Sequence, residues 1–496
     1  MLRWIKGLMA LTLSSVVRAE DEGFPIYPKD PFSTHDAVSS TPARSSNQAG
    51  SDPCLPRGVR GERWSLIDVI EQALCHNPQT RQAWANARMQ ASQLGVAEAA
   101  YLPSFNFTLP VSRSQNTAGG GISNGVPING GGGTNGAVRN TQYTRLVPTL
   151  SVNYLLFDFG GRAARVEAAR QTLEVANWQH ASVIQNVLFA AIQAYYQLFA
   201  SRASLEAAEQ TVKSMQVAYD SAAYRFDVGS AALGDKLQAQ TTLAQAKVNR
   251  RTAEGGAKAA VGVLANVMGL TPNHLMEFEA PNLVGPDPER ERDVEVLIDL
   301  AREARPDLAA AEAQVKSSEA NVLAAKSLGM PQLSLVGNYS YLDSINTVAV
   351  SSWAIGVQVS VPLFTGFSNT YQVHAAEEQL EVQAASRDQL EQAITQGVWQ
   401  SYYTLAATRD NLANTEELLV AAKEAERVAL GRYREGVGNI VELTNAENNL
   451  ANARFSFVQA HYNWRIGKAQ LAQALGRLDV DDVEAVEGGR QGGVID

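Results

Sequence analysis

The sequence has a long stretch without glycine or proline. The chain has 496 residues with 38 glycines and 18 prolines, yet residues 163–228 contain neither. Because both residue types disfavour a helix interior, their absence predicts one continuous helix. Its apolar positions recur at alternating spacings of four and three residues, from Ile184 to Ala222, which is the heptad pattern of a supercoiled helix. At roughly 1.5 Å per residue it would be about 100 Å long, so we expect a protein that spans a distance.

Long apolar runs are also missing. After the first residues no segment holds 18 consecutive apolar residues, so we expect no transmembrane helix in the mature chain. Residues 1–19 resemble a secretory signal peptide, because Arg3 and Lys6 precede a short apolar run and Ala19 offers a small residue for cleavage. The chain is therefore expected to be exported.

Cysteine is rare, and the two cysteines are Cys54 and Cys75. In an exported chain they most simply form one disulfide, which would tie the proline-rich extended arm at residues 20–63 to the first helix. Two unpaired thiols are the alternative. Residue 20 is Glu20, so no cysteine directly follows the signal and we expect no lipid anchor there.

Signals for catalysis and for cofactors are weak. The six histidines form no ligand-spaced pair, and there is no phosphate-binding lysine loop. Two glycine motifs, at residues 121–125 and 131–136, lie in a glycine-rich loop without the strand and helix that give such motifs their chemistry. The net charge of -10 argues against a nucleic-acid partner. We therefore expect no enzyme, no cofactor and no metal site.

The chain is a tandem duplication. Adding 207 to the residue number carries one copy onto the other, and before the strands the offset is 228, which pairs Pro78 with Pro306. The matched pairs at offset 207 include Phe157 and Phe364, Tyr195 and Tyr402, Arg225 and Arg432, Gly229 and Gly436, and Gly269 and Gly476. Repeat 1 covers residues 64–270 and repeat 2 covers 294–476. Residues 271–293 form a linker, and we expect the tail at 477–496 to be disordered.

Each repeat is predicted to hold the same helices and the same pair of strands. The expected fold class is therefore α+β. A first helix precedes two strands that alternate apolar and polar residues, then a long helix and a return helix follow. The strands are expected at about 104–112 and 147–157 and at about 332–341 and 353–363, the long helices at 163–228 and 368–434, and the return helices at 231–269 and 440–476.

Four amphipathic strands cannot close a barrel by themselves. Lipid does not satisfy the open edges of a sheet, and closure needs at least about eight strands. Several chains must therefore share one barrel. A dimer would give a filled eight-stranded barrel, whereas a trimer would give twelve strands and a polar lumen.

Residues 64–476 resemble the TolC-type outer membrane factors. The resemblance rests on the duplication and on three motifs, which are residues 73–78 (ALCHNP) with the echo at 304–306 (ARP), residues 362–366 (PLFTG) and residues 432–436 (RYREG). It implies a homotrimer with a twelve-stranded β-barrel in the outer membrane of a Gram-negative bacterium, continuous with a periplasmic α-helical barrel.

The resemblance also implies a function and partners. Such a channel-tunnel passively exports substrates in a tripartite efflux or type I secretion system. A periplasmic adaptor, or membrane fusion, protein and an inner membrane transporter of the RND or ABC type would deliver the cargo, and the barrel would contact outer membrane lipid. A trimeric structural or adhesive stalk anchored by a barrel is the alternative.

By the same resemblance, a periplasmic gate lies at the helix turns near Gly229 and Gly436. Asp235 and Tyr433 match the aspartate and tyrosine that link the helices in the family. The family's arginine position falls on Gly438, which is a departure from the pattern. We therefore expect a weaker lock.

The family also narrows its pore with acidic rings. The first ring position is Glu442, and the second is Asn445 in place of a carboxylate. Three copies of Glu442 close together would attract cations and raise one another's proton affinity. A solvated residue on a helix surface is the alternative reading of Glu442.

Overall fold

The computed structural model describes residues 30–38, 63–118, 122–123, 126–127, 139–272, 277–281, 293–344 and 349–478. The expected signal peptide, most of the arm and nearly all of the tail lie outside these residues. The chain divides into two compact units, which are described one at a time. Unit 1 consists of Met1–His35, Ala91–Gln171 and Lys316–Val382, and unit 2 of Asp36–Gln90, Thr172–Val315 and Gln383–Asp496.

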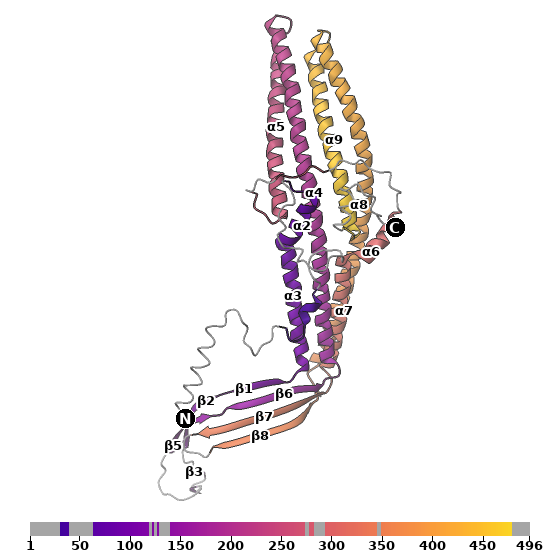
Figure 1. Ribbon diagram of the computed structural model, residues 1–496. Coiled ribbons are helices and arrows are strands. Elements are labelled where there is room, and N and C mark those ends of the chain that lie inside the picture. The colour runs from indigo at the N-terminus through magenta and orange to yellow at the C-terminus, as the bar shows by residue number, and fades with distance from the viewer. Residues whose placement is uncertain are drawn as a thin grey trace. The chain divides into compact units, whose positions relative to one another are not determined.

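The helices follow the same order twice along the chain (Figure 1). In repeat 1 they are α2 (Leu66–His76), α3 (Pro78–Glu98), α4 (Gly161–Asp227) and α5 (Leu233–Val267). In repeat 2 they are α6 (Val294–Ala304), α7 (Pro306–Ser327), α8 (Ser368–Arg434) and α9 (Ile440–Ala474). Two short 3-10 helices are η1 (Thr34–Ala37) and η2 (Ala99–Tyr101). Across the part of the chain that the structure describes, none of the helices combines the length and the apolar character needed to cross a membrane.

Unit 1 contains an antiparallel sheet in which β1, β6, β7 and β8 follow one another in that order. In the same sheet β2 pairs with β5, and β5 pairs with the last residues of β7. The strands are β1 (Ser104–Thr108), β2 (Val111–Ala118), β5 (Arg139–Leu146), β6 (Thr149–Phe157), β7 (Gln332–Ser344) and β8 (Val350–Ser360), and a separate small pair is β3 (Ile122–Ser123) with β4 (Val126–Pro127). The strand expected at 104–112 is interrupted at Pro110, and Pro148 separates β5 from β6. A proline has no N–H to donate to the ladder, which explains both interruptions.

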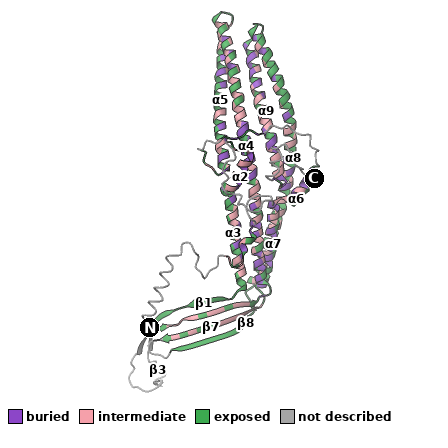
Figure 2. Ribbon diagram, in the orientation of Figure 1, coloured by how far each residue is buried: buried purple, intermediate pink, exposed green. Residues whose placement is uncertain are grey.

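The sheet leaves both of its edge strands exposed. Every residue of β1 and of β8 is exposed, as Figure 2 shows for β8. Apolar and small or polar residues alternate along β8, so that its larger side chains share one face. These are Trp353, Ile355, Val357 and Val359, which are 61–75% exposed.

The corner between β6 and α4 is held by a buried ion pair within unit 1. The side chains of Asp158 and Arg162 are 7% and 9% exposed, and Asp158 Oδ1 lies 3.7 Å from Arg162 Nε. The backbone N–H of Arg162 donates to Asp158 Oδ2 at 2.7 Å. The guanidinium donates to the carbonyl oxygens of Leu155 at 2.6 Å and Leu156 at 3.1 Å. The end of the strand is thereby attached to the first turn of the helix.

Unit 2 is built around a cluster of buried side chains from α2, α4, α5 and α9, among them Leu66, Leu198, Tyr195 and Leu264. Part of the expected linker belongs to this core. Phe278 is 5% exposed and pairs in a parallel bridge with Trp64, and the Tyr195 hydroxyl donates to the Glu279 carbonyl at 2.5 Å. This part of the linker is therefore attached to the core of unit 2. The composition of the linker did not predict this contact.

The end of each return helix touches the first helix corner of its own repeat. Gly269 and Gly476 have positive φ, and a Cβ at either position would lie within 3.0 Å of backbone atoms of residues 76 and 304–305 respectively. The Asn77 amide donates to the Val267 carbonyl at 3.0 Å, and Arg305 at the matching position donates to the Ala474 carbonyl at 3.1 Å. The two repeats thus use different side chains for the same contact.

We expect Asp158→Ala to lower the free energy of unfolding by about 3–5 kcal/mol, because it leaves the Arg162 guanidinium buried without its carboxylate. Thermal unfolding of the detergent-purified protein measures the loss. The control is Thr365→Ala, which changes the exposed residue at the matching position of repeat 2 and should have little effect. Equal losses in both variants would contradict the assignment.

Candidate functional site

The two hairpin turns have the same backbone geometry. Gly229 follows α4 with a φ of 77°, and Gly436 follows α8 with a φ of 80°. In the first turn the N–H groups of Ser230 and Ala231 donate to the Arg225 carbonyl, at 2.7 and 3.1 Å. In the second turn those of residues 437 and 438 donate to the Arg432 carbonyl, at 3.0 and 2.9 Å. A glycine in the left-handed conformation commonly ends a helix, because it lets the N–H groups that follow donate to the last carbonyl oxygens of the helix. Both hairpins therefore have a defined tip.

Tyr433 is the largest buried side chain near these tips. It is 2% exposed and packs among alanines of both hairpins, Ala218, Ala222, Ala239 and Ala429. Burial raises the pKa of the Tyr433 hydroxyl, the positive charge of Arg225 opposes this rise, and the carboxylate of Asp235 adds to it. The hydroxyl oxygen has no hydrogen-bond partner among the described residues. The ring therefore joins the two hairpins mainly by packing.

Arg225 supplies the polar contact between the hairpins. Its Nη1 donates to the Tyr433 carbonyl oxygen, and its guanidinium carbon lies 4.9 Å from the centroid of the Tyr433 ring. A guanidinium over an aromatic face is attracted by the ring as well as by the carbonyl. Sequence reasoning matched Arg225 with Arg432 but gave it no role at the gate.

Glu442 and Asp235 occupy matching positions, since the offset of 207 carries one onto the other. Both are half-buried and lie in the first turn of α9 and of α5. Arg432 Nε lies 3.5 Å from Glu442 Oε1, and because both side chains are about half exposed, the pair is worth at most about 1 kcal/mol. Asn445 is exposed on α9. The structure thus brings Asp235 and Tyr433 into electrostatic contact and pairs Glu442 with Arg432.

Gly438, where the resemblance implied an arginine, lies in a tight turn that would crowd a side chain. A Cβ there would lie 3.1 Å from the carbonyl carbon and Cβ of Arg432 and from the backbone N of Tyr433. A glycine therefore suits this turn better than a residue with a side chain. The arginine that contacts the tyrosine, Arg225, comes instead from the other hairpin.

Glu447 is a buried carboxyl group on α9 that sequence reasoning did not single out. It is 3% exposed and lies between Leu443 and Leu450 on the buried side of the helix. Burial raises the pKa of Glu447 to about 7, and the negative charge of Glu426 on α8 adds to the rise. Its Oε2 atom has no hydrogen-bond partner among the described residues. The sequence could have indicated Glu447, because its carboxyl group occupies a heptad position that is otherwise apolar.

Cys75 lies in α2, and Cys54 lies outside the described residues, so their disulfide stays a prediction. Within the described ranges, no group of three histidine, cysteine, aspartate or glutamate side chains is arranged to hold a metal ion.

Comparison with known proteins identifies the family. The model of the outer membrane efflux protein family matches residues 69–270 and 297–477. The chain belongs to the outer membrane efflux protein family. Protein CyaE of Bordetella pertussis is 29% identical over 446 residues, which cover 88% of this chain and 90% of that protein. Outer membrane protein TolC of Vibrio cholerae is 25% identical over 334 residues, which cover 65% of this chain and 75% of that protein.

Solved structures show the same fold. The CmeC outer membrane channel of Campylobacter jejuni has a TM-score of 0.72 at 17% identity, with 85% of this chain and 89% of that one covered. Together with the family, this likeness confirms the predicted fold and the TolC-type resemblance. This family member is an outer membrane channel that extends into the periplasm, and not an enzyme. It works with a periplasmic adaptor and an inner membrane transporter in a tripartite system.

We expect the stability of the folded chain to fall as pH rises through the window set by Glu447. Unfolded, the carboxyl titrates near pH 4.5, and folded it titrates near 7, so between these values only the unfolded chain releases the proton. The raised pKa corresponds to a loss of about 3 kcal/mol over this range. Glu447→Gln keeps the shape without the charge and should flatten the dependence. Melting temperatures from about pH 3.5 to about pH 8, roughly one unit beyond each pKa, measure it.

Glu424→Gln is the control for this titration, because Glu424 is 62% exposed on α8. This variant should keep the slope of the wild type. An unchanged slope in the Glu447→Gln variant would rule out Glu447 as the source.

We expect Gly438→Ala to destabilise the second turn by about 1–3 kcal/mol, because the neighbours of the new methyl group are backbone atoms that cannot rotate away. The matched control is Gly431→Ala in α8, where nothing lies within 4 Å of the added carbon. Alanine there should stabilise the helix by up to about 1 kcal/mol. Chemical unfolding of both variants measures the difference, and effects of the same sign would disprove the packing argument.

Proposed function

We propose that three copies of this chain form one outer membrane channel, in which their strands close into a single twelve-stranded barrel. The observation that carries the proposal is the sheet with two exposed edge strands, β1 and β8. In lipid each edge N–H and C=O group must find a partner, so such a sheet requires a further strand on both sides. A second copy offers β8 to β1 at one edge and β1 to β8 at the other.

The side chains of these strands agree with this arrangement. Phe105 and Phe107 on β1 and Trp353 and Ile355 on β8 are all at least 64% exposed and alternate with small or polar residues. An apolar outer face suits lipid, and a polar inner face suits a water-filled lumen. Two copies would give a barrel filled by its own side chains, whereas three copies leave a pore.

The helix turns are the gate of this channel in our proposal. Arg225 and Tyr433 join the tips of the two hairpins, and Asp235 lies near enough to act on the tyrosine. With threefold symmetry, Glu442 would form one acidic ring, followed by a ring of Asn445. A lock held by one guanidinium and a packed ring is weaker than a network of ion pairs.

The channel itself holds no energy source. An RND or an ABC transporter, acting through the adaptor, would supply the cargo, in efflux or in type I secretion. The names of three relatives fit a role in efflux or secretion. They are the outer membrane efflux protein BepC of Brucella suis, the toluene efflux pump outer membrane protein TtgC of Pseudomonas putida, and the toxin and drug export protein A of Aggregatibacter actinomycetemcomitans. Cargo therefore passes through a barrel that does not act on it chemically.

Arg225→Gln should open the gate, because it removes the cation from both the carbonyl and the ring of Tyr433. We expect the single-channel conductance of purified trimers in planar bilayers to rise severalfold. Tyr433→Phe should change conductance less, since it keeps the ring and the backbone carbonyl and removes only an unpaired hydroxyl. Glu442→Gln should reduce the selectivity for cations.

Arg251→Gln is the control, since Arg251 is 70% exposed on α5 and lies away from the turns. It should leave the conductance unchanged. Folded trimers that carry no current, even with Arg225→Gln, would favour the sealed stalk over a channel.

A further inference from the structure

The described strands carry few charges, and most of these charges are positive. They hold three arginines and one aspartate, which are Arg113 on β2, Arg139 and Arg145 on β5, and Asp343 on β7. Strands β1, β6 and β8 consist of uncharged residues. The chain has no aspartate or glutamate between Glu98 and Asp158, although its net charge is -10. The sheet therefore carries an excess of positive charge in an otherwise acidic protein.

The register of the sheet decides which face each charge occupies. Arg145 stands opposite Ser112 on β2 and opposite Ser344 on β7. Because alternate residues of a strand share a face, Arg145 lies on the face that also holds Ser340, and Arg139 lies on this face as well. The neighbouring residues of β1 and β6 on the same face are polar, and they include Ser104, Asn106, Ser151 and Asn153. Arg145 thus belongs to the polar face of the sheet.

Arg113 and Asp343 occupy the opposite, apolar face. On β2, Arg113 lies two residues after Val111, which pairs with Leu146, and Leu146 in turn pairs with Asp343. In the described strands the apolar face therefore holds one charge of each sign. On the polar face of these strands both charges are positive.

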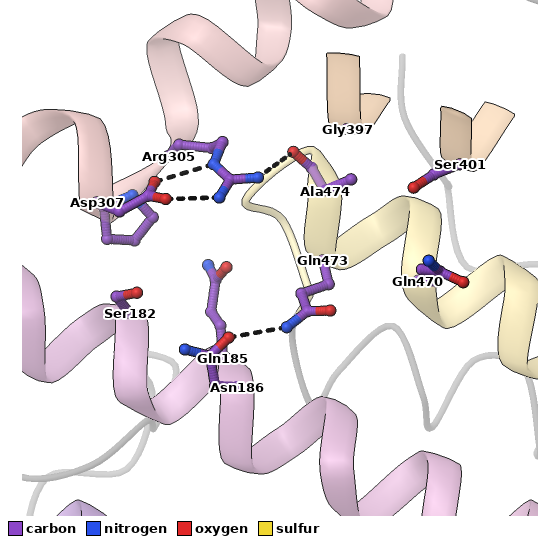
Figure 3. Close-up of a pocket in the computed structure, with 11 residues that line it drawn as sticks. Ser182, Gln185, Asn186, Arg305, Asp307, Gly397, Ser401, Gln470, Gln473 and Ala474 are labelled. Carbon is purple, nitrogen blue, oxygen red and sulfur yellow. Dashed lines mark hydrogen bonds and ion pairs between the residues drawn. The ribbon is translucent and has the colours of Figure 1, made fainter. Parts of the chain in front are cut away.

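Two arginines that hold helices in place elsewhere in the chain lie beside carboxylates. Figure 3 shows Arg305 with Asp307 in a polar pocket of unit 2, where the two carboxylate oxygens accept from Arg305 Nε at 2.9 Å and Nη2 at 2.5 Å. Arg162 has Asp158 at the corner between strand and helix in unit 1. Such a carboxylate offsets the charge of its guanidinium. The polar face of the described strands offers none, so this face keeps a net positive charge.

Arg145 lies at the end of the sheet that is farthest from the helices of unit 1. Strand β1 follows η2 and strand β6 leads into α4, so both strands meet helices at the same end. Strands β2 and β5 begin at the opposite end, beyond Pro110 and Pro148, as Figure 1 shows. Because the helices extend into the periplasm, the end with β2 and β5 is the outer mouth of the barrel in the proposed function.

We propose that Arg145 of three copies forms a cationic ring at the outer mouth of the barrel lumen, where it attracts solutes that carry carboxylate or phosphate groups. The proposal rests on the trimer of the proposed function and assigns a charge preference to its exit. Rings of arginine favour anions in pores, and a guanidinium binds either group through two N–H donors. Arginine also stays protonated over the whole accessible pH range, so the ring keeps its charge when Glu442 titrates.

Block of the single-channel current by inositol hexakisphosphate tests the ring in full-length trimers. Added to one side of a planar bilayer at about 10 mM salt, the probe should reduce the current, because the field of a charge then extends about 30 Å. In Arg145→Gln the concentration for half block should rise about tenfold. Arg145→Lys should keep the block, since it keeps the charge. At about 1 M salt, where screening reduces the range to about 3 Å, the block should disappear in the wild type.

Arg113→Gln is the matched control. It removes the same charge from the same hairpin, but Arg113 stands opposite Thr144 and so lies on the other face from Arg145. This variant should leave the concentration for half block unchanged. An equal loss of block in Arg113→Gln and Arg145→Gln would show that the face does not matter, and it would overturn the ring.

Ion selectivity gives a second measurement that needs no probe. In a Glu442→Gln background the acidic ring at the helix turns is neutral, so the contribution of Arg145 to selectivity is larger. Adding Arg145→Gln to this background should shift the reversal potential in a KCl gradient toward cation selectivity. Adding Arg113→Gln should leave the reversal potential where it was.

The outcomes separate the ring from the channel itself. Conducting trimers whose block and reversal potential are unchanged in Arg145→Gln overturn the ring and leave the channel proposal standing. Native gels report whether each variant still assembles, and Arg145→Lys with wild-type block shows that the charge at this position is what matters. Folded trimers that carry no current in any variant overturn the proposed function and the ring with it.

Discussion

The packing of each long helix against its own return helix is the interaction on which the rest of this structure depends. A helix as long as α4 or α8 gains little from propensity alone and is stabilised mainly by the apolar stripe that it buries. Near the hairpin tips this stripe includes alanines such as Ala222, Ala239 and Ala429, which pack together with Tyr433 and Leu443. A polar atom buried in such a seam without a hydrogen-bond partner destabilises the fold, and the Tyr433 hydroxyl and Glu447 Oε2 are two such atoms among the described residues.

The duplication gives the two halves the same residues in different surroundings. Asn77 and Arg305 contact matching carbonyl groups, whereas Arg225 binds Tyr433 and its counterpart Arg432 binds Glu442. Tyr196 is buried and Tyr403 is exposed. Because repeat 1 has repeat 2 beside it within the chain, only one set of faces is covered internally.

A channel that crosses the outer membrane and extends into the periplasm needs a different structure in each place. In lipid, backbone groups must be paired, which favours a closed sheet. In water, long helical hairpins reach across the periplasm without a large core. The corner at Asp158 and Arg162 is where the chain changes from one to the other in repeat 1, and a buried ion pair there holds strand and helix in a defined relation. Repeat 2 has Thr365 and Asn369 at these positions, so its corner lacks this pair.

The sequence by itself determined the repeated elements, because the absence of glycine and proline, the heptad spacing and the alternation in the strands are local signals. It also determined where the hairpins turn, since Gly229 and Gly436 follow each long helix. Which side chains meet at those turns was decided only by the tertiary structure. Arg225 reaches Tyr433 from more than 200 residues away, Gly438 is enclosed by the backbone of residues 432–433, and Glu447 acquires its pKa from the helix packed over it. Such contacts depend on how helices that are distant in sequence rotate about their axes when they pack, and no local pattern specifies that rotation.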